Sequence, residues 1–163
     1  MQAPITFAIG RPLLPLAAAA TIANVHPREI VMAIQDGGIP YAFHIEPSTG
    51  QRDYRVYTPA LKTYMDGQRP DPRLETPARL QQILGALFPA PVVNGLALRH
   101  FAGSLVAGTN LARVLSCSNH TIQRLITAGH LRAVRRSQFT GPGSSPRIYR
   151  DSIIQWLIKR RIT

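Results

Sequence analysis

The sequence has a single cysteine and no uninterrupted apolar run of the roughly 18 residues that crossing a bilayer takes. One cysteine cannot form an internal disulfide, which fits a chain that stays in a reducing compartment. An apolar stretch near the start, residues 13–23, follows only one basic residue, Arg11. We interpret it as a first helix and not as a secretory signal. We expect a cytoplasmic protein with no membrane partner.

Acidic residues are also scarce, and their scarcity argues against catalysis. Asp151 is the only acidic residue in residues 111–163, which leaves little for general acid–base or magnesium chemistry there. The five histidines are scattered, without metal-ligand spacing and without a cysteine pair beside them. No phosphate-binding glycine loop, nucleophile elbow or pair of catalytic acids is present. We therefore expect no enzyme, no metal site and no cofactor.

Positive charge is abundant and unevenly spread. The chain has 19 Lys and Arg against 8 Asp and Glu, a net charge of +11. Residues 1–70 and 71–110 each carry a net charge of +1, whereas residues 111–163 carry +9. Nearly all of the basic residues in this last part are arginines, which hold phosphates and base edges bidentately. The pattern favours a nucleic acid as the partner, bound mainly by the C-terminal third.

The chain also contains an internal repeat. Residues 14–65 and 106–157 follow the same plan at a constant offset of 92 residues, and apolar positions match apolar positions throughout. The identical pairs include Ala20/Ala112, Ile30/Ile122, Ile34/Ile126, Gly37/Gly129, Arg55/Arg147 and Tyr57/Tyr149. The repeat predicts two copies of one small domain.

The second copy shows a pattern of two helices joined by a tight turn. Leu111, Val114 and Leu115 indicate a short first helix, and Ser118 is a good N-cap for a second helix over residues 118–128. Gly129 ends this helix. Its apolar stripe consists of Ile122, Leu125 and Ile126, and its outward face of Asn119, His120, Gln123 and Arg124. Amide and guanidinium groups on such a face suit base reading in a major groove.

After Gly129, the second copy predicts two short strands around a Gly/Pro/Ser-rich tip, followed by a last helix. Asp151 opens that helix, and Ile153, Trp156 and Leu157 face the core. The first copy has the same skeleton. Its second helix starts at Pro27 and ends at Gly37, residues 39–57 form strand, turn and strand, and Thr58 caps the last helix.

These residues resemble the winged helix-turn-helix of phage and plasmid excisionases and of MerR-type regulators. The family pattern is an apolar helix, then S-x-x-T-[VI]-x-R-[LW]-[IV]-x-x-G-x-[LI], a wing and an R-x-[IV] strand. The second copy matches it at Ser118, Thr121, Ile122, Arg124, Leu125, Ile126, Gly129, Leu131, Arg147 and Ile148. The first copy matches more loosely, at Ile30, Ile34, Gly37, Ile39, Arg55 and Val56, with His26 and Glu29 in place of the Ser and Thr.

The resemblance implies that the second helix enters a major groove while the wing follows the backbone or an adjacent minor groove. It implies base reading by His120, Gln123 and Arg124, beside Ser118 and Asn119 at the start of the same helix. It also implies wing contacts by Arg132, Arg135, Arg136 and Arg147. An arginine at position 147 has an alternative role, which is to brace the wing internally.

The two copies are not equivalent on the face of the second helix. Val31 and Met32 stand where the second copy has Gln123 and Arg124, and apolar side chains cannot bond bases or phosphates. We interpret this face as a protein contact or a degraded DNA-reading helix, and the alternative is that Val31 or Met32 packs against the segment between the two copies. Because Arg28 and Gln35 on this helix are polar, weak contact with DNA is a further alternative.

The predicted fold is mainly α with small β-hairpin wings: two tandem winged helix-turn-helix units joined by a helical segment. We expect an N-terminal unit over residues 1–66, a linker with connecting helices over 67–105, and a C-terminal basic unit over 106–163. Residues 76–88 and 94–108 read as connecting helices, and residues 3–9 as a strand. The apolar stripe of residues 76–108 is either core packing or a homodimer interface.

Two hypotheses for function follow. The first is a protein that binds double-stranded DNA with a sequence preference. It would act as a transcriptional regulator or an excisionase-like recombination directionality factor of a plasmid, phage or other mobile element, associated with the bacterial nucleoid. The second is an adaptor whose first copy binds a protein partner, such as a recombinase, a polymerase subunit or a toxin, with DNA binding secondary.

Overall fold

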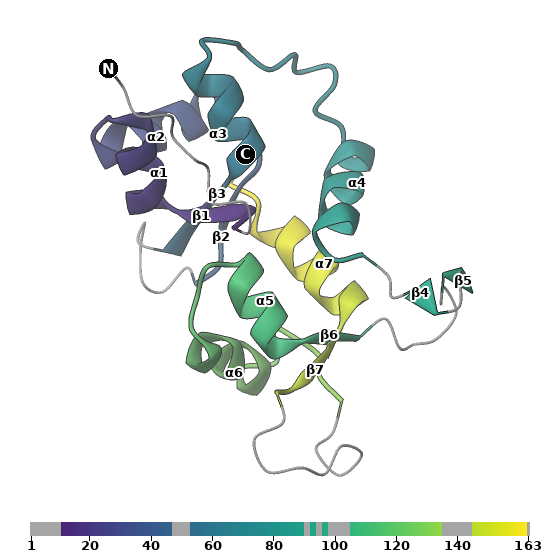
Figure 1. Cartoon of the computed structure of the whole chain (residues 1–163). Coiled ribbons are helices and arrows are strands. Elements are labelled where there is room, and N and C mark those ends of the chain that lie inside the picture. The colour runs from purple at the N-terminus through teal and green to yellow at the C-terminus, as the bar shows by residue number, and fades with distance from the viewer. Residues whose placement is uncertain are drawn as a thin grey trace. The chain divides into compact units, whose positions relative to one another are not determined.

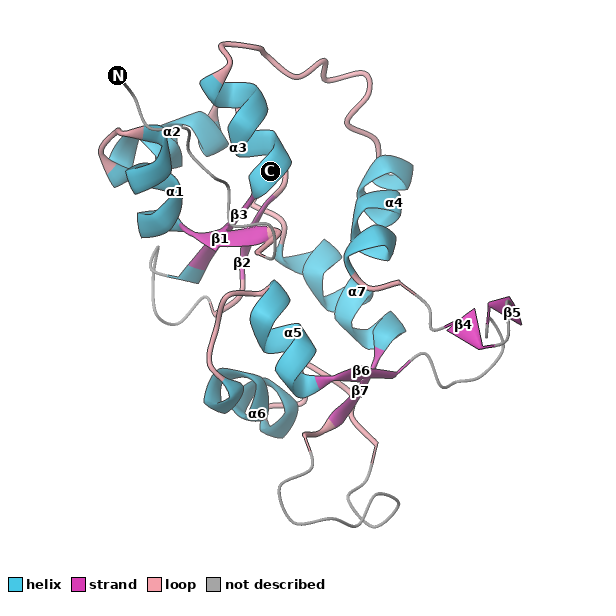
Figure 2. Ribbon diagram, viewed as in Figure 1, coloured by secondary structure: helices cyan, strands magenta, loops and turns pink. Residues whose placement is uncertain are grey.

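The structure is a computed structural model that describes residues 11–46, 53–89, 92–93, 96–97, 105–134 and 145–162. Contacts between Cα atoms divide the chain into two compact units. The first unit comprises Met1–Pro77, Val114–Ser116 and Arg160–Thr163, and the second comprises Ala78–Arg113 and Cys117–Lys159. The described residues form seven helices and small antiparallel sheets, a mixed α/β architecture that is compatible with the predicted helices and hairpins (Figure 2).

The first unit is built on a three-stranded antiparallel sheet with strand order β1-β3-β2. Its elements are β1 (Leu13–Pro15), α1 (Leu16–Ala23), α2 (Pro27–Gln35), β2 (Ala42–His44), β3 (Tyr54–Tyr57) and α3 (Thr58–Met65). Val56 pairs with Leu14 on one side and with Ala42 on the other. Helix α1 packs against α2, α3 and β3, and the three helices gather beside the sheet (Figure 1). The apolar side chains between them form the core of this unit.

The chain after the first six elements contains four helices and four short strands within its described residues. They are α4 (Pro77–Leu87), β4 (Val92–Val93), β5 (Leu96–Ala97), β6 (Leu105–Ala107), α5 (Gly108–Val114), α6 (Asn119–Thr127), β7 (Arg147–Tyr149) and α7 (Arg150–Arg160). Ile148 in β7 pairs with Val106 of β6 and forms a bridge with Ala133 on its other side. Ile148 therefore occupies the place that Val56 has in the first unit.

The two halves of the chain repeat each other in hydrogen bonding as well as in sequence. Strands β1 and β6 begin 92 residues apart, and so do helices α1 and α5, α2 and α6, and α3 and α7. The amide of Val25 donates to the carbonyl of Ala20 over 3.1 Å, and the amide of Cys117 donates to that of Ala112 over 3.0 Å. The amides of Asp36 and Ala128 likewise donate to the carbonyls four residues before them.

Local sequence explains the ends of α2 and α6. His26 caps α2 by accepting from the amide of Arg28, and the carboxylate of Glu29 accepts from the amide of His26. Ser118 caps α6 by accepting from the amide of Thr121 over 3.1 Å. Beyond the C-termini, Gly37 and Gly129 have φ of 74° and 78°, a conformation that costs glycine little. The predicted starts and ends of both helices are thereby confirmed.

Two predicted helices are wrong in part. Residues 13–23 contain strand β1 before α1 begins at Leu16, because Leu13–Pro15 pairs with β3. Within residues 94–108, the residues that the structure describes form strands β5 and β6 until α5 begins at Gly108. Both segments are apolar enough for either structure, and pairing with a partner strand decides between them. The predicted strand over residues 3–9 lies outside the described residues.

Two further predictions concern helix α3 and helix α4. Thr58 is the first residue of α3 and not its cap, because its hydroxyl donates to the carbonyls of Arg11 and Pro12. Helix α4 confirms the predicted helix over residues 76–88, and its stripe residues Leu80 and Leu84 are buried within the chain. The burial of these two residues favours packing within the chain for this part of the stripe. No helix in the described ranges is both long and apolar enough to cross a membrane.

Candidate nucleic-acid interface

Helix α6 presents one polar face to solvent. Ile122 and Leu125 are buried against the core of the second unit, at 1 % and 3 % exposure. The exposed residues on the opposite side follow the helical period, and they are Asn119, His120, Gln123, Arg124 and Thr127. The predicted base-reading residues His120, Gln123 and Arg124 therefore share one exposed face.

The start of α6 is fixed by Ser118. Its hydroxyl oxygen accepts from the amide of Thr121 and lies 3.1 Å from the hydroxyl of Thr121. These bonds give Ser118 a structural task, because they satisfy one of the amides that a helix leaves unpaired at its N-terminus. The remaining unpaired amides and the positive end of the helix dipole suit a nearby phosphate.

The side chains on this face carry complementary chemistry for DNA. The amides of Asn119 and Gln123 can bond adenine bidentately, and the guanidinium of Arg124 can bond guanine. All of these groups end on flexible side chains that extend from a short, capped helix. A helix of nine residues is long enough for its N-terminal turns to place side chains at successive bases in a major groove.

The wing arginines that the structure describes are both exposed. Arg132 stacks its guanidinium over the ring of Tyr149, 4.6 Å from the ring centroid, and its amide donates to the hydroxyl of Ser152. This stacking orients a charged group beside β7. Arg147 is exposed on β7 itself. Arg135 and Arg136 lie outside the described residues.

Arg55 shows the bracing role that was the alternative for Arg147. Arg55 occupies the equivalent position in β3 but is only 5 % exposed. Within the first unit, its Nε donates to the carbonyl of Leu115 over 2.6 Å, and its guanidinium also donates to the carbonyls of Ser116 and Tyr54. A buried guanidinium that satisfies several carbonyls is a structural brace. Sequence reasoning did not identify it, because the two arginines are identical in the alignment.

The face of α2 in the first unit differs from that of α6. The interpretation of Val31 as an outward residue is wrong, because Val31 is 5 % exposed and belongs to the core cluster of this unit. Met32 is 52 % exposed, and Arg28 and Gln35 are exposed as predicted. The exposed face of α2 therefore does not include the position that corresponds to Gln123 in α6.

The exposed face of α2 also carries two carboxylates. Glu29 and Asp36 are exposed, whereas the equivalent positions of the second copy hold Thr121 and Ala128. Carboxylates repel DNA phosphates, and Arg28 alone does not outweigh two of them. Sequence reasoning missed the two acids as part of this face, although their spacing around Met32 is helical.

The histidines, cysteine and acidic residues of the described segments do not gather in one place. The described residues contain no group of three or more His, Cys, Asp and Glu side chains that could hold a metal ion. Cys117, half-buried in the turn before α6, aligns with the half-buried Val25 of the first copy. This position suits a small apolar side chain.

Comparison of the chain with protein families, curated proteins and solved structures gives no match.

Proposed function

We propose that the chain is a double-stranded DNA-binding protein built from two tandem winged helix-turn-helix units, in which the second unit binds the duplex. The single observation that carries this proposal is the exposed face of α6, where Gln123 and Arg124 project beside Asn119 and His120. The buried side of the same helix is anchored by Ile122 and Leu125. The exposed face of the helix can therefore contact a DNA groove while its buried face stays packed inside the protein.

Charge supports the same assignment. The second unit, Ala78–Arg113 and Cys117–Lys159, has ten Lys and Arg and one acidic residue. The first unit has nine basic and seven acidic residues. Neutralising phosphates releases condensed counterions, so this excess supplies most of the affinity for any duplex at low salt. Base contacts from α6 then select among sequences.

The mechanism has three parts. Arginines of the second unit dock the protein on the backbone, α6 enters the major groove, and the wing around Arg132 and Arg147 contacts the neighbouring backbone or minor groove. The sequence pattern of the second copy resembles that of excisionases and MerR-type regulators. On this basis, we propose that the protein acts as a transcriptional regulator or a recombination directionality factor of a mobile element, on the bacterial nucleoid.

The proposal is tested by selecting bound sequences from random duplex DNA and footprinting the protein on the selected site. We expect a short enriched motif and one protected stretch of about one helical turn, since one unit carries the reading face. Replacing the exposed Arg147 with alanine should weaken binding to all sequences alike and reduce the salt slope by roughly one. Binding without any enriched motif and without a salt dependence contradicts the proposal.

A further inference from the structure

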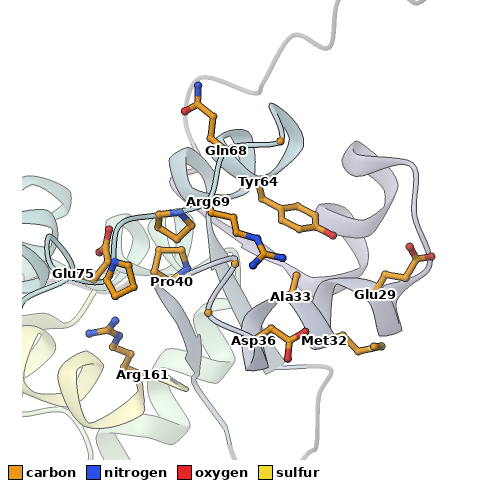
Figure 3. A pocket seen from close by; sticks show the side chains of 15 residues that line it. Glu29, Met32, Ala33, Asp36, Pro40, Tyr64, Gln68, Arg69, Glu75 and Arg161 are labelled. Atoms are coloured by element: carbon orange, nitrogen blue, oxygen red, sulfur yellow. The ribbon is translucent and has the colours of Figure 1, made fainter.

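The first unit contains a pocket of about 1020 Å³ whose lining residues all belong to that unit. One wall is the exposed face of α2, with Glu29, Met32 and Asp36 (Figure 3). The end of α3 contributes Tyr64, and the chain that follows contributes Arg69. Pro40, Pro70 and Pro72 add rigid apolar surface to the same pocket. Of the α2 residues in this pocket, Met32 stands at the position that Arg124 has on the proposed DNA-reading face of the second copy.

The apolar part of the pocket is open to solvent. Met32 is one of two large hydrophobic residues that are strongly exposed among the described residues, and Tyr64 is half-buried. Methionine is flexible and polarisable, so it adapts to varied apolar side chains and is common on surfaces that bind peptides. The volume lies at the upper end of the range for small-molecule sites, about 300–1,000 Å³. An open site of this size fits a segment of polypeptide better than a small metabolite.

The charged groups on the pocket point to a basic occupant. Glu29, Asp36 and Glu75 line it, which is three of the eight acidic residues of a chain with net charge +11. The Oε2 atom of Glu75 is buried and makes no hydrogen bond, so it can accept from an incoming donor. Arg69 and Arg161 also line the pocket, and their N–H groups suit peptide carbonyl oxygens. Phosphate groups would meet the carboxylates of α2 and be repelled.

We propose that this pocket binds an extended peptide segment of a partner protein, in which a Lys or Arg side chain stands beside an aliphatic or aromatic one. The apolar side chain packs on Met32 and Tyr64, and the basic side chain pairs with Asp36 and Glu29. The peptide backbone accepts hydrogen bonds from Arg69. The first copy is thus a peptide-docking module, and its function does not depend on whether α6 binds DNA.

The test is selection from a displayed library of random dodecapeptides against the full chain. We expect enrichment of peptides that combine Lys or Arg with Leu, Ile, Met or Phe. This result is informative because the bulk charge of the protein favours acidic peptides. Synthetic labelled versions of the selected peptides are then titrated by fluorescence anisotropy against the wild-type chain and its variants.

The variants are chosen so that the fold survives. Met32→Asp changes a half-exposed side chain, and Asp36→Lys places a cation at the C-terminal end of α2, where the helix dipole favours it. Glu29→Gln retains the capping box, which accepts either residue. We expect Met32→Asp and Asp36→Lys to weaken peptide binding roughly tenfold or more. Arg124→Ala, at the position equivalent to Met32, should leave peptide binding unchanged.

Three results would overturn this inference. The first is a library that enriches only acidic peptides or no peptides. The second is a set of selected peptides whose affinity does not change in the Met32 and Asp36 variants. The third is a change of DNA affinity in the Met32 or Asp36 variants while no peptide binds. The last result would make the first unit a second DNA contact. Failure of DNA binding by α6 variants tests the proposed function separately, because it leaves the peptide titrations unaffected.

Discussion

Asn24 and Ser116 have the same left-handed backbone conformation, with φ of 54° and 49°, at positions 92 residues apart. Asn24 follows the last residue of α1, and Ser116 closely follows α5. The next residue in each copy, Val25 or Cys117, donates its amide to the carbonyl five residues earlier. This shared turn directs the chain from the first helix into the second, so the connections from α1 to α2 and from α5 to α6 have one local cause.

Asn24 allows the importance of this turn to be measured. A β-branched residue in the left-handed region places its side chain against the backbone, so Asn24→Val should lower the free energy of unfolding by about 1–2 kcal/mol. Asn24→Gly should be tolerated, because glycine adopts this conformation readily. Urea denaturation of both variants checks the prediction. Equal stability of the valine and glycine variants would show that the turn conformation is not required.

Arg55 and Arg147 provide a comparison of equivalent positions with different burial. Arg55→Leu removes a buried donor from the carbonyls of Leu115, Ser116 and Tyr54, and it should cost on the order of 3 kcal/mol of stability. Arg147→Leu changes an exposed side chain and should alter stability by no more than about 0.5 kcal/mol. Thermal melting of the two variants measures the difference.

Arg55→Lys serves as the control for charge. Lysine keeps the positive charge but lacks the planar guanidinium that reaches three carbonyls, so most of the loss should remain. Full stability in the lysine variant would mean that charge alone, and not the hydrogen-bond geometry, stabilises this position.

The ends of α2 and α6 are predictable from sequence because they are local. Ser118 and Pro27 start these helices, and Gly37 and Gly129 end them, through effects on residues only a few positions away. The stripe of Leu80 and Leu84 is predictable for the same reason, since its spacing alone indicates a buried helix face. The same locality makes the shared exposed face of Gln123 and Arg124 predictable.

Features that depend on distant partners are not predictable in this way. Leu13–Pro15 forms a strand by pairing with β3, and the apolar character of residues 13–23 alone does not indicate that partner. The burial of Val31 depends on the core of the first unit, while the aligned Gln123 is exposed. The pocket combines α2 with Tyr64 from the end of α3 and with Arg69 from the segment predicted as a linker.

Ser118 tests whether folding and binding can be separated at the start of α6. Ser118→Ala removes the cap and should lower the stability of the second unit by about 1 kcal/mol. Ser118→Asp retains a capping oxygen and should preserve stability, but its charge should weaken DNA binding, because it faces the phosphates expected near the helix N-terminus. Circular dichroism melts and DNA titrations of both variants are required. Unchanged DNA affinity in the aspartate variant would place the duplex elsewhere.

The most direct test of DNA reading by α6 compares Arg124→Ala with Met32→Ala, the equivalent change in the first copy. The measurement is the Kd for the selected duplex and for a single-base variant of it at one fixed salt concentration. Arg124→Ala should lose about 1–3 kcal/mol on the selected duplex and little on the altered one, so that discrimination falls. Met32→Ala should change neither value. Equal losses for both variants, or no loss for Arg124→Ala, would contradict the assignment of α6 as the DNA-reading helix.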